Sequence, residues 1–140
     1  MILGVGTDMI EIERVRKACE KQAFFTRCFS IREQELIRGH MEKAAGNFAV
    51  KEAVAKVFGT GFSGFRPGHI EVLRDERGKP YVNLLCGAKR VAVALGITKI
   101  HVSITNTDCY AMAFAVGEGE YDEISADGSA DERRRPENHL

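Results

Sequence analysis

The chain has 140 residues, of which 44% are hydrophobic and 8% aromatic, so it fits one domain with a hydrophobic core and is not a disordered protein. Its 20 Lys and Arg residues balance 20 Asp and Glu residues, which excludes a strongly basic nucleic-acid-binding protein. The charge is unevenly spread, because residues 118–140 contain eight acidic and three basic residues, and residues 1–117 therefore carry the positive excess. A basic body suits an acidic partner or a phosphorylated ligand, although ordinary scatter of charges would also produce it.

The cysteines and the N-terminus indicate where the protein acts. Four cysteines are present, without a CxxC pair and without a histidine at zinc-ligand spacing, so we expect reduced thiols. The N-terminus reaches Asp8 after a few apolar residues and has no basic segment, unlike a signal peptide. No apolar stretch approaches the ~18 residues that a membrane span needs. We therefore expect a soluble, cytoplasmic protein.

In chain order, the first expected elements are a short strand and three helices. Residues 2–5 form an apolar run that Gly6 closes, and helical spacing of apolar residues follows at about 10–21. Ser30 and Glu33 have the spacing of a capping box, which predicts a helix up to about residue 38. The third helix is expected at 47–58, separated from the preceding helix by Gly46 and ended at Gly59.

The second half of the chain favours hairpins and a short helix. Strands are expected at 70–74 and 81–85 around a turn, then a helix at 87–95. An alternating strand at 99–105 follows, and after a turn its partner strand is expected at 110–116. The hydrophobic pattern ends after Gly117, so we expect a domain at 1–117 and an acidic, mobile tail at 118–140. The fold class predicted is α+β, an antiparallel sheet with packed helices.

The segment 48–58 carries the most informative pattern. Eight of its eleven residues are apolar, so a helix there must be largely buried. Glu52 and Lys56 are four residues apart and share one narrow polar stripe on that helix. They could form an ordinary ion pair on a solvated face, or they could present a carboxylate and an ammonium group to a cleft.

Asp8 and His101 are two further candidates for chemistry. Asp8 follows the first strand where a helix is expected to begin, so it could cap that helix or bind a metal. Two carboxylates, with water and phosphate oxygens completing the shell, suit Mg²⁺. His101 lies on the polar face of its strand, where it could make a structural hydrogen bond, contact a phosphate or transfer a proton.

Five blocks of sequence then combine into one pattern. They are GVGTD at 4–8, FAVKEA at 48–53 with Lys56 and FGTG at 58–61, IEV at 70–72 with Asp75, GKP at 78–80, and HVSI at 101–104. In this order they resemble the holo-[acyl-carrier-protein] synthase family, the small type of 4′-phosphopantetheinyl transferase. The segment from FAVKEA to FGTG is the most specific, and the resemblance covers about residues 1–117.

The resemblance implies an enzyme that moves 4′-phosphopantetheine from coenzyme A to a serine hydroxyl of apo acyl carrier protein. Adenosine 3′,5′-bisphosphate would be released, and the reaction would support fatty acid biosynthesis. The resemblance also implies Mg²⁺ as cofactor and a homotrimer with active sites at the subunit interfaces. Neither nucleic acid nor a membrane is expected as a partner.

The same resemblance assigns roles to individual residues. Asp8 and Glu52 fall on the Mg²⁺ ligands, and Lys56 falls on a phosphate-facing lysine. His101 falls on a histidine whose role we leave open between a phosphate contact and proton transfer, so the catalytic set is Glu52, Lys56 and His101. Arg14 falls on an arginine that meets the acidic helix of the carrier protein. The residues expected to bind coenzyme A are Lys51, Lys56, Gly59, Thr60, Gly78, Lys79, Pro80 and His101.

Some points depart from the pattern or stay open. Asn47 stands where the family commonly has an arginine, which puts one phosphate contact to coenzyme A in question, and Asn106 replaces a variable histidine. The serine proton could leave through Glu52 or through a water on the metal. Two alternative functions are an Mg²⁺-dependent pyrophosphatase and a binding module without turnover. The acidic tail could compete with acidic partners for the basic surface.

Overall fold

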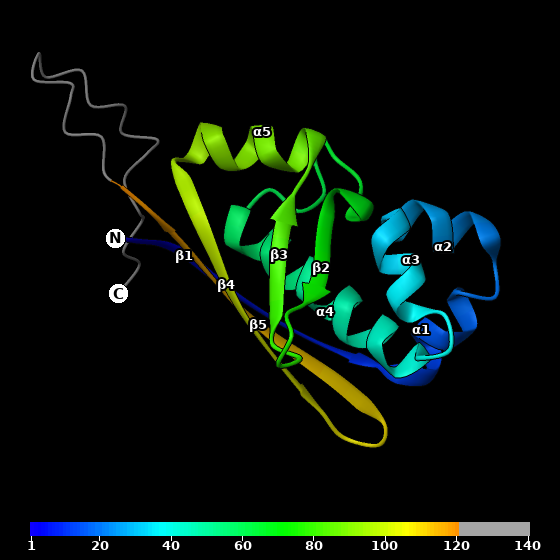
Figure 1. The fold of residues 1–140 in the computed structure, drawn as a ribbon. Coiled ribbons are helices and arrows are strands. Elements are labelled where there is room, and N and C mark those ends of the chain that lie inside the picture. Colours follow the sequence, from blue (N-terminus) through cyan, green and yellow to red (C-terminus); the bar gives the residue numbers. More distant parts are fainter. Residues whose placement is uncertain (121–140) are drawn as a thin grey trace, which may run out of the picture.

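The structure is a computed structural model, and it describes residues 1–120. The long helix α4 packs across a three-stranded antiparallel sheet, a two-stranded hairpin lies beside it, and short helices close one end (Figure 1). This arrangement confirms the expected α+β class. In chain order the elements are β1 (Ile2–Glu11), α1 (Ile12–Ala18), α2 (Gln22–Cys28), α3 (Ile31–Ile37), α4 (Met41–Phe58), the 3₁₀ turn η1 (Pro67–His69), β2 (Ile70–Arg74), β3 (Pro80–Leu84), α5 (Cys86–Leu95), β4 (Ile97–Asn106) and β5 (Tyr110–Gly119).

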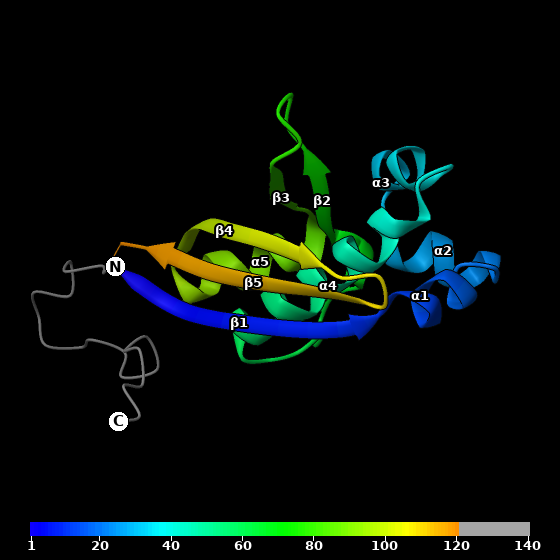
Figure 2. The same cartoon turned by 90° about the horizontal axis from the view of Figure 1, so that it is seen from below.

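The three-stranded sheet has the order β1-β5-β4, so β1 and β4 form its two edges. The register pairs Asp8 of β1 with Ala113 of β5, and Ala113 with Ile104 of β4. Figure 2 views this sheet with α4 and α5 behind it. The hairpin β2-β3 is a separate sheet that contacts β4 through β3. The hairpin therefore lies at the β4 edge, away from β1.

Glycines on the sheet let α4 approach its strands closely. A Cβ atom on Gly6 would lie 2.0 Å from the carbonyl oxygen of Ala53, and one on Gly117 would lie 2.5 Å from the side chain of Val57. No other residue fits such a contact, so the glycines set the distance between helix and sheet. The core of this layer contains fully buried small and branched residues, among them Ala49, Val50, Ala53, Val54, Ile70, Val72 and Ala115.

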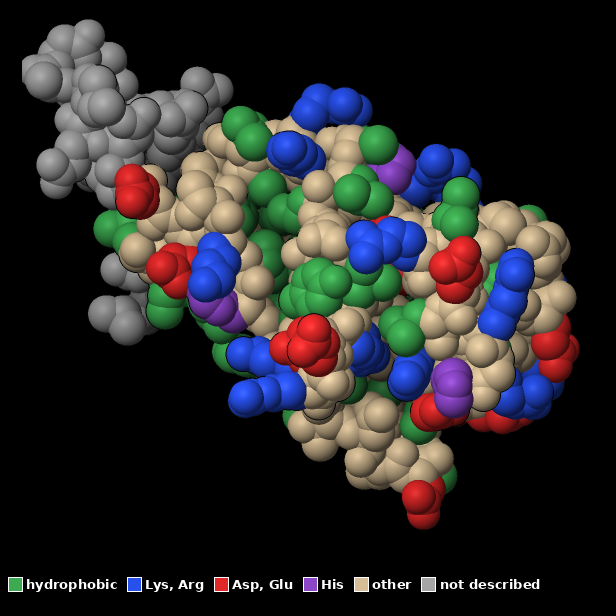
Figure 3. Space-filling model, in the orientation of Figure 1, with side chains coloured by type: hydrophobic (Ala, Val, Ile, Leu, Met, Phe, Trp, Pro, Cys, Tyr) green, Lys and Arg blue, Asp and Glu red, His purple; other side chains and the backbone are tan. Residues whose placement is uncertain are grey.

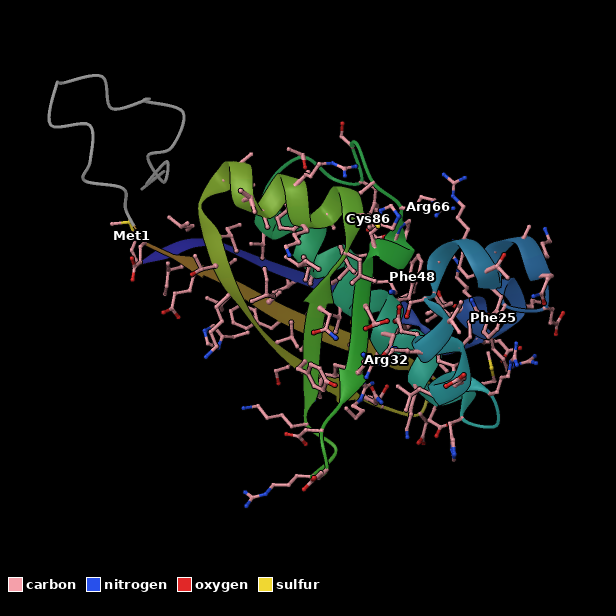
Figure 4. The ribbon with its side chains drawn as sticks, turned by 45° about the horizontal axis from the view of Figure 1, so that its top comes forward. Met1, Phe25, Arg32, Phe48, Arg66 and Cys86 are labelled. Atoms are coloured by element: carbon pink, nitrogen blue, oxygen red, sulfur yellow. The ribbon has the colours of Figure 1, made fainter. Side chains whose placement is uncertain are left out.

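A second core joins the short helices to the start of α4. It includes Phe25 of α2, labelled in Figure 4, together with Phe29 and Ile37. The capping box of α3 is formed as predicted, because the Ser30 hydroxyl accepts from the Glu33 N–H and the Glu33 carboxylate accepts from the Ser30 N–H.

Three element boundaries differ from the expectations. β1 continues through Gly6 to Glu11, so Asp8 lies inside a strand and is not the cap of a helix. α4 begins at Met41 and includes the buried Gly46, and α2 is an additional short helix. β5 continues to Gly119, two residues past the expected end of the domain, and the rest of the acidic tail from residue 121 lies outside the described residues. Among residues 1–120, no helix has the length and apolar character needed to cross a membrane.

Candidate active site

Asp8 and Lys56 meet where β1 passes under the last turns of α4. The Lys56 ammonium donates a hydrogen bond to the Thr7 carbonyl at 2.7 Å, and its Nζ lies 3.7 Å from Oδ1 of Asp8. The close approach of β1 and α4 at Gly6, two residues before Asp8, makes this contact possible. The structure therefore brings together Asp8 and Lys56, two of the residues that the resemblance assigns to the site.

Glu52 lies one turn before Lys56 on α4, and its carboxyl group forms a pair with that of Asp8. Burial raises the pKa of Glu52, and the charge of Asp8 raises it further, while Lys56 acts in the opposite direction. Burial also raises the pKa of Asp8, again against the effect of Lys56. Two partly buried carboxyl groups, one of which raises the pKa of the other, form a site with an excess of negative charge that a cation would relieve.

These carboxyl groups open into a groove of about 340 Å³ between β1, α1 and α4. Its remaining walls are mostly apolar, and Arg14 of α1 lies along it. The lining residues are Asp8, Met9, Ile10, Arg14, Val15, Ala18, Phe24, Phe48 and Glu52. Phe48, labelled in Figure 4, closes the groove against Phe24 with a ring separation of 5.7 Å. The groove can hold a flexible apolar chain beside a charged centre.

The carboxylates of Asp8 and Glu52 fit Mg²⁺ as an incomplete ligand set. Among residues 1–120, no group of three or more His, Cys, Asp or Glu side chains could hold a metal ion. Mg²⁺ commonly takes one or two carboxylates from the protein and completes its shell with water and substrate phosphates. The donors present are therefore sufficient only if a phosphorylated substrate supplies further oxygens.

His101 lies away from this groove. It pairs across the sheet with Val116, whereas Asp8 pairs with Ala113, and the alternation of the strands puts the two side chains on opposite faces. His101 is also on the edge strand β4, and its Nε2 lies 2.9 Å from the Glu118 carboxylate. One copy of the chain therefore does not bring His101 to Asp8.

The residues predicted to bind coenzyme A fall into two groups in the structure. Gly59 and Thr60 follow the end of α4, close to Lys56 in sequence, and belong with Asp8 and Glu52 to what we name the groove half. The others lie at the β4 edge and form what we name the hairpin half; they are Gly78, Lys79, Pro80 and His101. The turn of the hairpin is held by Asp75, whose carboxylate accepts from the N–H groups of Arg77 and Lys79.

The prediction that Lys51 binds coenzyme A is wrong. Its side chain is fully buried, and its ammonium lies 2.6 Å from the Glu33 carboxylate and 3.1 Å from the Pro67 carbonyl. A third hydrogen bond goes to the Ile70 carbonyl. All three ammonium protons are thus used inside the core, where they join α4 to α3, η1 and β2.

The buried charges belong to a polar network that sequence reasoning missed. Asn47 is fully buried and donates from Nδ2 to the Glu33 carboxylate and to the Val72 carbonyl, both at 3.0 Å. Glu71 of β2 accepts from the Ser30 hydroxyl at 2.7 Å and lies 3.5 Å from Arg32, labelled in Figure 4. The capping box at 30–33 was the only sequence signal for this network, and it gave no sign of the ion pair.

Comparison with known proteins agrees with this geometry. The family model described as the 4′-phosphopantetheinyl transferase superfamily matches residues 4–115. The holo-[acyl-carrier-protein] synthase of Lachnoclostridium phytofermentans is 55% identical over 118 residues, which cover 84% of this chain and 97% of that protein.

Solved structures of acyl carrier protein synthases also resemble this chain. The Plasmodium yoelii acyl carrier protein synthase with ADP bound has a TM-score of 0.78 and 31% identity, over 86% of this chain and 98% of that chain. The Bacillus anthracis holo-(acyl-carrier-protein) synthase in complex with CoA (3′,5′-ADP) has a TM-score of 0.71 and 31% identity, over 86% of this chain and 99% of that chain. The chain therefore belongs to the holo-[acyl-carrier-protein] synthase family and is a transferase of the 4′-phosphopantetheinyl transferase superfamily.

Proposed function

We propose that this protein transfers 4′-phosphopantetheine from coenzyme A to a serine hydroxyl of apo acyl carrier protein, in an Mg²⁺-dependent reaction that releases adenosine 3′,5′-bisphosphate. The observation that carries the proposal is the convergence of Asp8, Glu52 and Lys56 at one end of a largely apolar groove. Carrier proteins modified in this way serve fatty acid biosynthesis, which is the process we assign to this activity.

The proposed transfer reaction needs a metal site and a cation beside the phosphates, and the groups at the groove can supply both. A hydroxyl must attack the β-phosphate of a pyrophosphate whose oxygens carry several negative charges. Mg²⁺ held by Asp8 and Glu52 would neutralise part of that charge. Lys56 would stabilise the phosphate that leaves, because its ammonium already lies beside Asp8. The attacking hydroxyl loses its proton either to Glu52 or to water.

The substrate arm and the carrier protein fit the rest of the groove. The pantetheine arm is flexible and largely apolar, and Ile10, Val15 and Phe48 give it an apolar wall. Arg14 lies at the same groove and has no salt bridge among residues 1–120, so it can meet an acidic helix of the carrier. Attraction of this kind weakens as salt concentration rises.

We infer that the active site is shared between copies in a homotrimer. The groove half lies at the β1 edge and the hairpin half at the β4 edge, so one coenzyme A can contact both only across an interface between two chains. The outer face of the sheet supports such an interface, because Val5, Met9, Met112 and Phe114 are 44–63% exposed on it. His101 of one copy would then complete the groove of the next.

Mass spectrometry of the carrier protein tests the proposal. Full-length protein is mixed with apo carrier protein, coenzyme A and MgCl₂, and the carrier should gain one phosphopantetheine group. Omission of MgCl₂ with added EDTA should stop the gain. The pyrophosphatase alternative predicts instead that adenosine 3′,5′-bisphosphate forms at the same rate without any carrier, and that result would refute the proposed transfer.

A further inference from the structure

The outer face of α5 carries positive charge that no neighbouring acid offsets. Lys89 and Arg90 are exposed there, and within residues 1–120 neither forms a salt bridge. The chain segments that carry and adjoin them, 59–69 and 80–98, contain no Asp or Glu. Figure 3 shows Lys or Arg side chains, and no Asp or Glu side chain, over α5 on the face in view. Such a surface favours an acidic partner.

Two further basic side chains extend this surface past the first residue of α5. The Leu85 N–H, directly before α5, donates to the His69 carbonyl at 2.8 Å, which holds η1 against the start of the helix. Burial lowers the pKa of His69, and the charges of Arg66 and Arg90 lower it further, so both arginines lie near this ring. We name the four basic residues Arg66, His69, Lys89 and Arg90 the α5 ridge.

The other end of the same helix face is apolar, and the chain leaves the described structure beside it. Val93 is 68% exposed, and it lies one turn after the bases of α5 on the same face. A Cβ on Gly119 would lie 1.9 Å from the carbonyl oxygen of Gly96, the residue that ends α5. Residues beyond Glu120 therefore begin next to the apolar end of α5.

Residues 121–132 have the composition that would complement this face. They contain five acidic residues and no Lys or Arg, and they begin with Tyr121, Asp122 and Glu123. The helix is about 15 Å long, and twelve residues of extended chain span up to about 40 Å, so the segment can reach the whole α5 ridge. Carboxylates are also favoured towards the N-terminal end of a helix, where the ridge lies.

We propose that residues 121–132 dock along α5 of the same chain, with Tyr121 against Val93 and the acidic side chains against the α5 ridge. Each ion pair on such a surface is weak, but the segment directly follows Glu120, so its effective concentration at α5 is high. Docking neutralises the ridge and holds this acidic segment at the end of the molecule away from α1 and Arg14 (Figure 1). The inference does not depend on the proposed transferase function.

A disulfide between the segment and α5 tests the docking in the full-length protein. Cys86 is exposed at the first residue of α5, Ser125→Cys adds a thiol to the segment, and Cys109→Ser removes the other exposed thiol. Equilibration with reduced and oxidised glutathione gives the effective concentration of the thiol pair. Lys89→Glu with Arg90→Glu, the ridge variant, should lower it roughly 5- to 30-fold, because two ion pairs are lost. Sodium chloride at about 1 M should lower it too, because salt screens the charges.

An exchange of charges separates docking from loss of folding and from the effect of net charge. Asp122→Lys with Glu123→Lys, added to the ridge variant, should restore most of the effective concentration, because the ion pairs form again with reversed signs. Lys17→Glu with Lys21→Glu, at exposed positions on and after α1, changes the net charge equally and should leave the effective concentration unchanged. The inference is wrong if the ridge variant shows no loss, if this control loses as much, if the exchange restores nothing, or if the disulfide joins two chains.

Discussion

At the scale of single residues, Asp8 and Glu52 combine partial burial with mutual repulsion, and this combination leads to two predictions. The first concerns activity. Glu52→Gln keeps the size of the side chain but removes one of the two carboxylates, so transfer should fall by roughly 100-fold or more. The rate of carrier modification measures this. Glu35→Gln, on the exposed side of α3, is the matched control and should keep its rate; near-normal turnover of Glu52→Gln in MgCl₂ would contradict the assignment.

The second prediction concerns stability without metal. Because burial and Asp8 raise the pKa of Glu52, the folded state holds this proton more tightly than the unfolded state. The charged carboxylate therefore destabilises the metal-free protein at neutral pH, and that cost disappears as the pH falls through the raised pKa. In EDTA at pH 7, Glu52→Gln should raise the Tm by about 2 °C or more. The difference between variant and unaltered protein should shrink on acidification, and a lower Tm for the variant at pH 7 would contradict the argument.

A third prediction concerns the buried ion pair of Lys51 and Glu33. Lys51→Met leaves the Glu33 carboxylate in the core without its cationic partner, which should lower the free energy of unfolding by about 3–5 kcal/mol. Denaturation in urea measures the loss. Lys17→Met, on the exposed side of α1, is the control and should change the free energy of unfolding by less than about 0.5 kcal/mol. If both variants unfold at the same urea concentration, the ion pair of Lys51 does not stabilise the core.

Neighbouring residues on α4 explain how far sequence reasoning reaches at this scale. The four-residue spacing of Glu52 and Lys56 correctly predicted a shared face, because helical geometry fixes it. Lys51 is adjacent to Glu52 and looks equally polar in the sequence, yet it points into the core. Only the positions of Glu33, Pro67 and Ile70 decide this, and those residues are distant along the chain.

At the scale of elements, the contact between β1 and α4 determines whether the groove forms. Gly6→Ala would put a methyl group 2.0 Å from the Ala53 carbonyl oxygen, so strand and helix must separate. We expect a loss of about 1–3 kcal/mol in unfolding free energy, together with weaker carrier modification, because Asp8 moves with the strand. Thr7→Ala, at the exposed neighbouring position, is the control for the stability measurement. Unchanged stability of Gly6→Ala would show that the contact is not tight.

Glycines also mark where prediction of elements from the sequence failed. Gly6 and Gly46 were interpreted as ends of elements, since glycine commonly ends strands and helices. Both instead lie inside an element. A Cβ on Gly6 would collide with the Ala53 carbonyl oxygen, and one on Gly46 would make a tight contact of 3.2 Å with the Ile104 side chain. Gly59 was interpreted correctly, because its φ of 75° ends α4 in the left-handed conformation. The sequence alone does not separate these two uses of glycine.

At the scale of the whole molecule, the proposed sharing of the site predicts that two inactive variants restore each other. Glu52→Gln damages the groove half and His101→Ala damages the hairpin half, so each alone should be inactive. Mixed trimers, formed by unfolding and refolding the two variants together, contain interfaces where an intact groove half meets an intact hairpin half. Carrier modification should return to a fraction of the unaltered rate. Glu52→Gln mixed with Asp8→Asn is the control and should stay inactive, and recovery no greater than in that mixture would argue against a shared site.

Assembly is also the scale at which least could be predicted from the amino-acid sequence. Alternation along residues 99–105 predicted that His101, Ser103 and Thr105 face away from the core, and these side chains are indeed exposed. What covers this face of the sheet could not be predicted from spacing, because Phe114 or Met112 on a strand looks the same whether it faces solvent or a second chain.

The order β1-β5-β4 has a consequence for how the protein would behave in a dilute solution. Since the two halves of the proposed site lie at opposite edges of one sheet, a chain that has left its assembly would have every residue of the site and no complete copy of it. Specific activity, and not only total activity, should therefore decline once the protein concentration falls below the dissociation constant of the assembly. A cell that produces few copies of this chain would then obtain disproportionately little transfer from each one.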